Sequence, residues 1–517
     1  MGVKHWAVRW IAGLAIIGGL SGAPPAVAQS DPPATVARLA RITGAVTIRD
    51  AGEESWRIGR VNQPLPPGDA GWVEPGGQAV LDLAASRIGL AGGAELRLDA
   101  LEDQAVAATL AQGEMHLRLL HTPVNTVTRI HTPRGIASLS GDGRYAINAG
   151  DATRPTLVTV FEGSARLDIP GASTSLAANQ AATITGNGPY QVATGPARLN
   201  AFAVAMMAQE PRIADATPAL VRQMTGVGDL AQYGEWRSTS DLGTVWVPRV
   251  EAGWVPYRDG LWAWVEPWGW TWVDDAPWGF APFHYGRWAR FDQMGASMAG
   301  QDWAWVPAPL HAGVGFRPAY APALVSFLGM RRPAGLTVAP RRGAFAVLGW
   351  VPLGPPEAYR PGFAASAAFL RRLDVNHVRN ATGTATGTAT GTEGIPAPAM
   401  NRGAATLVPA WAMLASRPAQ LARTRLPPLP PEGMEPIQGT DLPGPVPATI
   451  GMTPFMAERM GLIGPGAERV PQRARLHVFP TLRPAGAGSP REPGTAPGPD
   501  IMPAFPGLRR APGPPPR

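Results

Sequence analysis

The sequence predicts a mainly β protein in which two β-rich parts are joined by a short helical linker and followed by a disordered Pro-rich tail. Short runs that alternate apolar and polar residues fill the first part, as expected for strands with one buried face. The second part contains Trp residues spaced two apart between turn-forming residues. Glycine (62) and proline (58) are frequent among the 517 residues, which favours turns and short strands. Because the chain has no Cys, packing alone must hold these parts together.

Residues 1–28 have the pattern of a secretory signal peptide. Two basic residues begin it, and an apolar run follows from about Ile11 to Leu20. That run is shorter than the roughly 20 residues that a membrane span requires. Small residues then predict cleavage after Ala28. We therefore expect a bacterial periplasmic or secreted protein that is not an integral membrane protein after signal cleavage.

Residues 36–190 are predicted to form one all-β domain. VARLARITGAVTIRD and GGQAVLDLAASRIGLAGGAELRLDAL alternate apolar and polar residues, and Gly and Asp separate the runs. LVTVFEGSARLDI is interpreted as two strands with a turn at Glu162-Gly163. The glycines of GDGRYAIN are also assigned to a turn, because no helix is expected after them.

Four segments of this domain together resemble the FecR domain family. In chain order they are LPPGDAGWVEPGGQAVLDL, VTRIHTPRGIASLSGDGRYAINAG, TLVTVFEGSARLDI and LAANQAATITG. The resemblance covers about 150 residues and implies a periplasmic, β-rich domain. Such domains commonly relay signals from an outer-membrane receptor to a sigma-factor regulator. The relay proteins carry a cytoplasmic segment and a membrane span before the domain, whereas this chain has the predicted signal peptide there.

Residues 195–235 are predicted to be a helical linker, and residues 236–378 a module of β-hairpins with further strands and loops. Twelve of the 18 Trp residues lie between Trp236 and Trp305. Several of them are two residues apart, as in LWAWV, GWTWV and DWAWV, and residues at this spacing share one face of a strand. Turn-forming residues such as RDG, EP and DDAP separate the pairs. The pattern predicts short hairpins that bury their faces against one another.

This second part resembles an exported bacterial family that is defined only as a domain of unknown function, numbered 6600. The segment that carries most of the likeness is GWTWVDDAPWGFAPFHYGRW, and WVPYRDGLWAWV and DWAWVPAP support it. The family often follows a FecR-like domain, as it does here. The resemblance implies an architecture and a location, and it implies no chemistry.

The Trp residues allow two interpretations. Burial of one indole removes about 150–250 Å² from water and contributes roughly 4–6 kcal/mol before opposing terms, so a core role accounts for most of them. Alternatively, indoles on an exposed strand face would stack on sugar rings. The candidate residues of such a glycan site are Trp262, Trp270, Tyr285 and Trp288.

We expect no enzyme activity, cofactor or metal site. Asp274-Asp275 could supply the two carboxylates of a glycoside hydrolase, but adjacent strand residues point to opposite faces and Asp before Ala-Pro is common in turns. His116, His121 and His131 match no metal-ligand spacing. No phosphate-binding loop, dinucleotide fingerprint or catalytic-serine motif occurs in the sequence.

The net charge of +7 does not predict nucleic-acid binding. Lys4 is the only lysine, so every basic residue after the predicted signal peptide is Arg, and these residues are scattered along the chain. Abundant Ala, Gly, Pro and Arg are interpreted as a compositional bias of the source genome.

Residues 379–517 are predicted to be a disordered, low-complexity and Pro-rich tail. ATGT occurs three times from Ala381, and LPPLPPEGMEP, LPGPVP and APGPPPR follow. Small polar repeats cannot bury a core, and Pro-rich segments favour extended, solvated backbone.

Together these observations predict a non-enzymatic, exported cell-envelope protein. Its FecR-like domain is expected to bind another envelope protein or to regulate one. The alternative function is binding of glycan or peptidoglycan by exposed Trp residues of the segment 246–305.

Overall fold

The computed structural model describes residues 30–102, 105–122, 126–291, 302–307, 318–331, 345–355, 357–374, 400–427, 429–460 and 462. These residues all belong to one compact unit. The fold is mainly β with short helices, which confirms the predicted class. The predicted signal peptide and its cleavage site at Ala28 lie outside the described residues. Of the predicted tail, residues 379–399, 428, 461 and 463–517 also lie outside them.

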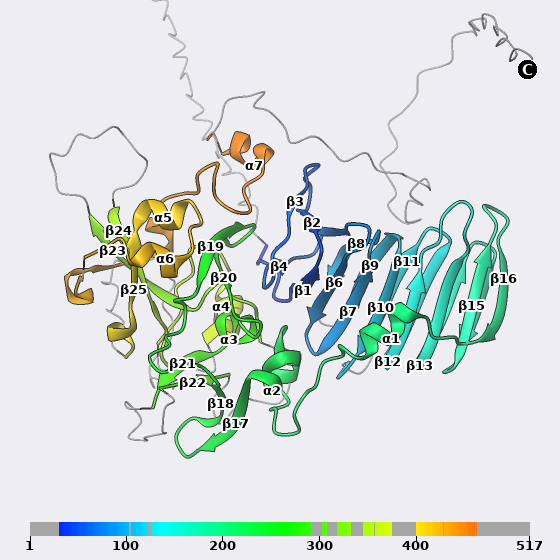
Figure 1. Cartoon of the computed structure of the whole chain (residues 1–517), viewed down its shortest axis with the longest axis horizontal. Coiled ribbons are helices and arrows are strands. Elements are labelled where there is room, and N and C mark those ends of the chain that lie inside the picture. Colours follow the sequence, from blue (N-terminus) through cyan, green and yellow to red (C-terminus); the bar gives the residue numbers. More distant parts are fainter. Residues whose placement is uncertain are drawn as a thin grey trace, which may run out of the picture. The chain divides into compact units, whose positions relative to one another are not determined.

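The first part, which we call the sandwich, consists of the strands up to residue 196 (Figure 1). These strands are β1 (Ala37–Thr43), β2 (Val46–Arg49), β3 (Arg57–Ile58), β4 (Pro64–Leu65), β5 (Ala70–Val73), β6 (Gln78–Leu83), β7 (Ser86–Ala91), β8 (Glu95–Leu101), β9 (Ala105–Gln112), β10 (Glu114–Leu119), β11 (Val127–Thr132), β12 (Gly135–Asn148), β13 (Thr156–Ile169), β14 (Ala172–Leu176), β15 (Gln180–Thr185) and β16 (Gln191–Pro196).

The strands of the sandwich form two layers that pack face to face. The first layer has the order β4-β1-β6-β7-β10-β12-β13-β15-β16, and the second has the order β3-β2-β5-β8-β9-β11-β12-β13-β14. Strands β12 and β13 belong to both layers, because each pairs with different neighbours along its two halves. Side chains of both layers contribute to one apolar core, in which Leu81, Leu117, Leu110 and Leu139 are fully buried.

The long strands β12 and β13 correct two sequence-based turns. Glu162-Gly163 and the glycines of GDGRYAIN do not end strands, since both lie inside 14-residue strands. The strand pairing shifts register between Ser140 and Arg144, which marks a bulge where the strands pass from one layer to the other. Gly163 has a φ of +89°, and a Cβ there would collide with the hydroxyl of Tyr145. The turn-forming residues therefore bend continuous strands.

The linker crosses the outer face of the first layer. It contains α1 (Ala201–Met207), η1 (Val221–Gln223), η2 (Val227–Asp229) and α2 (Leu230–Tyr233). Asn200 begins α1 by accepting a hydrogen bond from the backbone N–H of Ala203 at 2.7 Å. Met206 packs over Gly89 of β7, where any Cβ would collide with its sulfur. The predicted helical character is therefore present, although α1 is only seven residues long.

The remaining elements form the Trp-rich part. Its strands are β17 (Gly234–Thr239), β18 (Gly243–Pro248), β19 (Gly260–Val265), β20 (Gly269–Asp274), β21 (Arg287–Arg290), β22 (Trp303–Val306), β23 (Val325–Arg331), β24 (Phe345–Pro352), β25 (Thr406–Pro409) and β26 (Glu435–Ile437). Its helices are α3 (Ala281–His284), α4 (Ala367–Asp374), η4 (Arg402–Ala404), α5 (Ala410–Leu414), α6 (Ala419–Arg423), η5 (Pro431–Gly433), η6 (Gly439–Asp441) and α7 (Pro454–Arg459). Helix α4 lies in the segment 307–378, for which only strands and loops were expected.

The described strands of the Trp-rich part form three small sheets, and two of these sheets place Trp residues opposite one another. In the hairpin of β19 and β20, Trp262 faces Trp272 and Trp264 faces Trp270. In the sheet β17-β18-β22-β21, directly opposed residues form a row across all four strands. This row consists of Trp236, Trp246, Trp305 and Trp288. In the hairpin, the two-residue spacing thus places indoles side by side on one strand face, as the sequence predicted, and the opposed rings make edge contacts.

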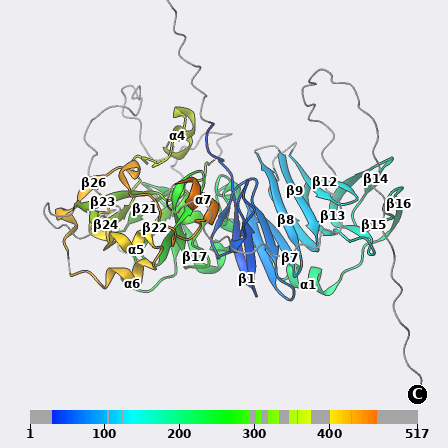
Figure 2. The same cartoon turned by 90° about the horizontal axis from the view of Figure 1, so that it is seen from above.

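The prediction of a disordered tail from residue 379 is wrong for the described residues 400–427 and 429–460. Strand β25 pairs with β24, and β26 pairs with β23, so the third sheet has the order β25-β24-β23-β26. Strands β23, β24 and β26 are labelled in Figure 2, and β25 in Figure 1. Both strands lie at sheet edges, where Pro409 and Pro436 are tolerated because one side of an edge strand makes no ladder hydrogen bonds. Composition alone misled the prediction, since these short strands are stabilised by partners far away in the sequence.

Candidate functional site

The four candidate glycan-binding residues lie in the interior of the Trp-rich part. Trp262 is on β19, Trp270 is on β20, Tyr285 ends α3 and Trp288 is on β21. Their exposed fractions are 1%, 8%, 4% and 1%. A sugar ring needs an open aromatic face, and none of these four side chains offers one.

Buried indoles instead connect segments that are distant in the sequence. Trp262 makes edge contacts with Trp272 and Trp350, with ring centroids 5.5 and 5.3 Å apart. The Nε1 of Trp350 donates a hydrogen bond to the carbonyl of Tyr257 at 2.7 Å, and that of Trp270 donates to the carbonyl of Pro443 at 3.0 Å. Edge contacts between aromatic rings and satisfied N–H groups both stabilise a core. The observed role of these Trp residues is therefore structural.

The adjacent carboxyl groups of Asp274 and Asp275 diverge. Asp274 is buried and accepts hydrogen bonds from Trp272 Nε1 at 2.9 Å and from the backbone N–H of Ala276 at 3.0 Å, whereas Asp275 is exposed. Burial raises the pKa of Asp274 well above its usual range. Its two hydrogen bonds close the turn after β20, which is a structural role.

The three histidines that were considered as metal ligands lie on separate elements. His116 is buried on β10, His121 is in an exposed turn and His131 is on β11. Within the described residues, no group of three or more His, Asp or Glu side chains is arranged to hold a metal ion. His284 is also buried, and burial lowers its pKa to about 3, so this imidazole is neutral.

A feature that the sequence did not reveal is a continuous row of charged side chains on the outer face of the first layer. Directly opposed residues of neighbouring strands share a face of the sheet. The register of six consecutive strands therefore aligns Arg38, Asp82, Arg87, Arg118, Arg144 and Glu162, which we call the charged row. Four positive and two negative side chains leave an excess of two positive charges within the row.

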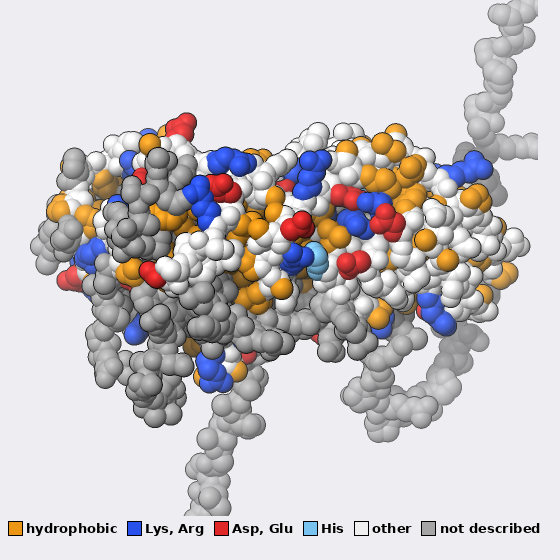
Figure 3. Space-filling view, turned by 90° about the horizontal axis from the view of Figure 1, so that it is seen from below, with side chains coloured by type: hydrophobic (Ala, Val, Ile, Leu, Met, Phe, Trp, Pro, Cys, Tyr) orange, Lys and Arg blue, Asp and Glu red, His pale blue; other side chains and the backbone are white. Residues whose placement is uncertain are grey.

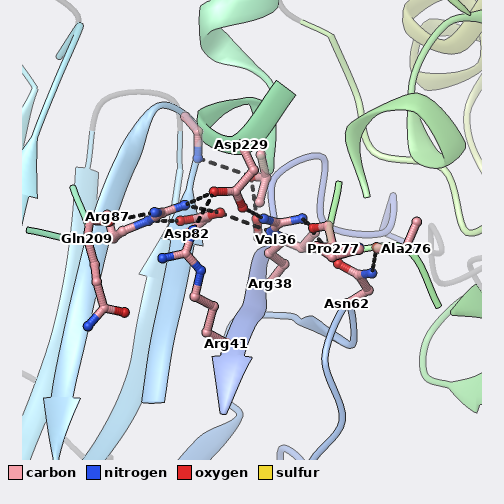
Figure 4. A network of polar contacts seen from close by, with 12 residues as sticks. Val36, Arg38, Arg41, Asn62, Asp82, Arg87, Gln209, Asp229, Ala276 and Pro277 are labelled. Atoms are coloured by element: carbon pink, nitrogen blue, oxygen red, sulfur yellow. Dashed lines mark hydrogen bonds and ion pairs between the residues drawn. The ribbon is translucent and has the colours of Figure 1, made fainter. Parts of the chain in front are cut away.

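The linker supplies the two missing negative charges. Asp229 of η2 accepts hydrogen bonds from Arg38 and from Arg87, the latter at 3.1 Å (Figure 4). Glu210 accepts two hydrogen bonds from Arg144, at 2.6 and 2.7 Å. With Asp229 and Glu210 added to Asp82 and Glu162, four carboxylates lie against the four Arg side chains of the charged row. Burial of unpaired charges is very costly, and this pairing removes that cost.

The end of the row nearest the Trp-rich part is completely buried. Arg38, Asp82 and Asp229 are 0%, 1% and 5% exposed. Arg38 Nε lies 2.9 Å from Asp82, and Arg87 Nε lies 2.7 Å from the other oxygen of the same carboxylate. Although burial raises the pKa of Asp82, the charges of Arg87 and Arg38 outweigh burial and lower it. Asp82 is therefore ionised in the folded protein.

The same network contacts the turn after β20. Arg38 Nη1 donates to the carbonyl of Pro277 at 3.2 Å and to Asn62 Oδ1 at 3.1 Å. Asn62 Nδ2 donates to the carbonyls of Asp274 and Ala276 at 2.9 and 2.7 Å (Figure 4). These bonds join the β4 end of the sandwich directly to the Trp-rich hairpin.

A cavity of about 230 Å³ lies beside the charged row, between the linker and the first layer. Its walls include Arg41, Arg87, Glu210, Arg212 and Asp229. Arg41 Nη2 lies 3.0 Å from Asp229, and the polar groups of Arg87 and Glu210 are already paired. The charged groups of this cavity thus hold the linker on the sandwich. On the face drawn in Figure 3, acidic and basic side chains are interspersed.

The family comparison concerns the Trp-rich part. Residues 227–357 match DUF6600, a family of unknown function. The match begins at η2, so Asp229 lies within the DUF6600 segment, whereas the sandwich lies outside it. No curated protein matches the chain. Among the described helices, none combines the length and apolar character that a bilayer span requires.

Solved structures show only a distant likeness. Two crystal structures of a candidate anti-sigma factor from Parabacteroides distasonis ATCC 8503, at 1.65 and 2.50 Å resolution, each share 16% sequence identity with this chain. They cover 28% and 30% of this chain and 68% and 73% of their own, and both have a TM-score of 0.23. A TM-score this low does not establish a common fold.

Proposed function

We propose that the chain is a non-enzymatic, exported envelope protein whose FecR-like sandwich binds another envelope protein through strands β14 and β16. The signal-peptide pattern of residues 1–28 and the four FecR-like segments support the location and the class of module. The observation that carries the proposal is an uncovered pair of edge strands at one end of the sandwich.

Strands β14 and β16 each pair on one side only among the described strands. Strand β14 pairs with the second half of β13, and β16 pairs with β15, so the two layers end together. Their residues, ASTSL and QVATGP, are mostly exposed and include no charged side chain. Sheet edges are usually protected by charges, bulges or covering segments, and an unprotected edge can pair with a strand of another protein.

Part of the surface of the sandwich is already occupied. The linker covers the charged row, and the Trp-rich part contacts the β4 end through Asn62. Strands β3 and β4 are also edge strands, but each has only two residues, so β14 and β16, with five and six residues, offer the longer edge for an added strand.

Site-specific photocrosslinking of the full chain in its native host tests this function. A photoreactive residue at Thr194 or Ser173, both exposed on the edge strands, should crosslink to one and the same envelope protein. The matched control position is Ala152, an exposed turn residue of the sandwich, which should give no such product. Thr194→Lys with Ser173→Lys should abolish the crosslink at neighbouring edge positions, because charges on an edge oppose strand pairing. Absence of a shared product from the two edge positions would refute the proposal.

Glycan binding by Trp262, Trp270, Tyr285 and Trp288 is less well supported, because all four are buried. Retention of the mature protein on insoluble cell-wall material, lost in a folded Trp270→Ala or Trp288→Ala variant, would favour it instead. If the protein binds its partner through the edge strands, these Trp variants should bind cell-wall material as the wild type does.

A further inference from the structure

Helices α5 and α6 form an exposed surface that is independent of the sandwich edge. Trp411 on α5 and Leu421 on α6 are 47% and 67% exposed, which is unusual for side chains of this size in the described chain. Arg417, Arg423 and Arg425 are exposed beside them. The guanidinium of Arg425 lies 5.7 Å from the ring centroid of Trp411. We call these five residues the Trp411 surface.

The Trp411 surface carries an excess of positive charge, because three of its five residues are exposed Arg side chains. Residues 402–431 contain four Arg and no Asp or Glu. Within the described residues, no ion pair involves Arg417, Arg423 or Arg425. Burial and the like charge of Arg423 lower the pKa of Arg258 on the adjacent turn, and Asp259 is the acidic group beside that pair.

The opposite faces of both helices are fixed in the core, so the exposed residues have a rigid support. Ala412, Met413 and Ala422 are buried among the aromatic residues of the Trp-rich part. Ser416 Oγ accepts a hydrogen bond from the backbone N–H of Ile450 at 2.8 Å, and Thr449 Oγ1 donates to the carbonyl of Leu414 at 2.6 Å. Figures 1 and 2 show α5 and α6 at the outside of the Trp-rich part.

We propose that the Trp411 surface binds the headgroup region of an anionic lipid bilayer. Charge complementarity selects an anionic partner, because the three exposed Arg side chains form no ion pair within the described residues and a single carboxylate, Asp259, lies near one of them, Arg423. The exposed indole and the Leu side chain select a partner with an apolar layer beneath its charges, since Trp prefers the interface between water and hydrocarbon. Only two apolar side chains enter the bilayer, so binding is peripheral and reversible.

Flotation of the mature full-length protein with lipid vesicles tests this inference. Vesicles of phosphatidylcholine with 30% phosphatidylglycerol should carry the protein upward at low ionic strength, and vesicles of phosphatidylcholine alone should not. Arg423→Gln with Arg425→Gln should weaken partitioning by about 25-fold, since each basic residue near an anionic surface contributes roughly a five-fold change. Trp411→Ala with Leu421→Ser should also reduce partitioning, because it removes the inserted apolar groups.

Matched controls separate this surface from general attraction of a basic protein. Arg129→Gln with Arg198→Gln removes one exposed charge from the sandwich and one from the linker, and Ile58→Ser removes an exposed apolar side chain from the sandwich. These controls should bind as the wild type does. The inference would be overturned if the wild type did not float with anionic vesicles, or if it bound neutral vesicles equally well. It would also be overturned if the variants and the controls lost binding equally, or if the protein bound soluble polyphosphate but no vesicles. A failed test here leaves the edge-strand proposal intact, because the two surfaces share no residue.

Discussion

At the scale of single residues, Asp229 is a residue through which the polar network joins the linker to the sandwich. Its carboxylate accepts hydrogen bonds from Arg38 and Arg87 of the sandwich, and the residue itself lies near the start of the DUF6600 segment, residues 227–357. All three side chains are at most 5% exposed. Buried ion pairs contribute little net stability compared with apolar packing, but removal of one partner leaves an uncompensated charge in the interior.

Asp229→Ala is therefore expected to lower the free energy of unfolding by about 3–5 kcal/mol. Asp168→Ala is the matched control, because Asp168 pairs with Arg166 on the surface at 3.0 Å, and both side chains are about half exposed. The control should change stability by no more than about 1 kcal/mol. Urea denaturation followed by circular dichroism measures both, and equal effects of the two variants would contradict a buried network.

The buried indoles lead to a second prediction at this scale. Trp272 is fully buried, contacts Trp262 and donates to Asp274, so Trp272→Ala should cost about 3–5 kcal/mol of unfolding free energy. Trp411→Ala should cost less than about 1 kcal/mol, because this indole is 47% exposed. A Trp272→Ala protein as stable as the wild type would show that the Trp-rich part is not packed as described.

At the scale of elements, the linker is held on the sandwich by Glu210. Although burial raises the pKa of Glu210, hydrogen bonds from Arg144 and His116 and the nearby positive charges lower it to about 2. In the unfolded chain, Glu210 has the usual pKa of 4.5. Because its pKa is lower in the folded chain, the ionised form of Glu210 stabilises the folded state. That gain is complete above about pH 4.5 and is lost as the pH falls towards about 2.

Stability should therefore decrease between about pH 4.5 and pH 2, and Glu210→Gln should show a shallower decrease over that interval. Thermal melts across the pH range, for the wild type and the variant, measure the difference. Parallel pH profiles for the two proteins would contradict the ion pairs between the linker and the charged row.

Elements also show what sequence patterns can and cannot reveal. The hairpin of Trp262 and Trp272 was predictable, because the two-residue spacing and the intervening turn residues are local. Strand β25 could not be predicted from local sequence, because Val408 pairs with Leu348, which is distant in the sequence. A low-complexity repeat lies between these two residues. The charged row was also missed, because a charged residue in an alternating strand indicates an outer face and does not tell what covers that face.

At the scale of the whole molecule, the sandwich, the linker and the Trp-rich part are joined by shared burial. Val36 and Ala85, which border the sandwich strands, belong to the same apolar cluster as the buried Trp residues. Thr225 Oγ1 donates to the carbonyl of Val36 at 2.7 Å and accepts from the backbone N–H of Ala84 at 3.1 Å. This continuity supports the central claim that the sandwich, the linker and the Trp-rich part form one cooperative unit.

Differential scanning calorimetry of the mature protein tests this claim most directly. Because the charged row and the common core connect the parts, the wild type should unfold in a single transition whose van't Hoff and calorimetric enthalpies agree. Asp229→Ala should lower the midpoint or split the transition in two. Two independent transitions in the wild type, with one unaffected by Asp229→Ala, would contradict the account.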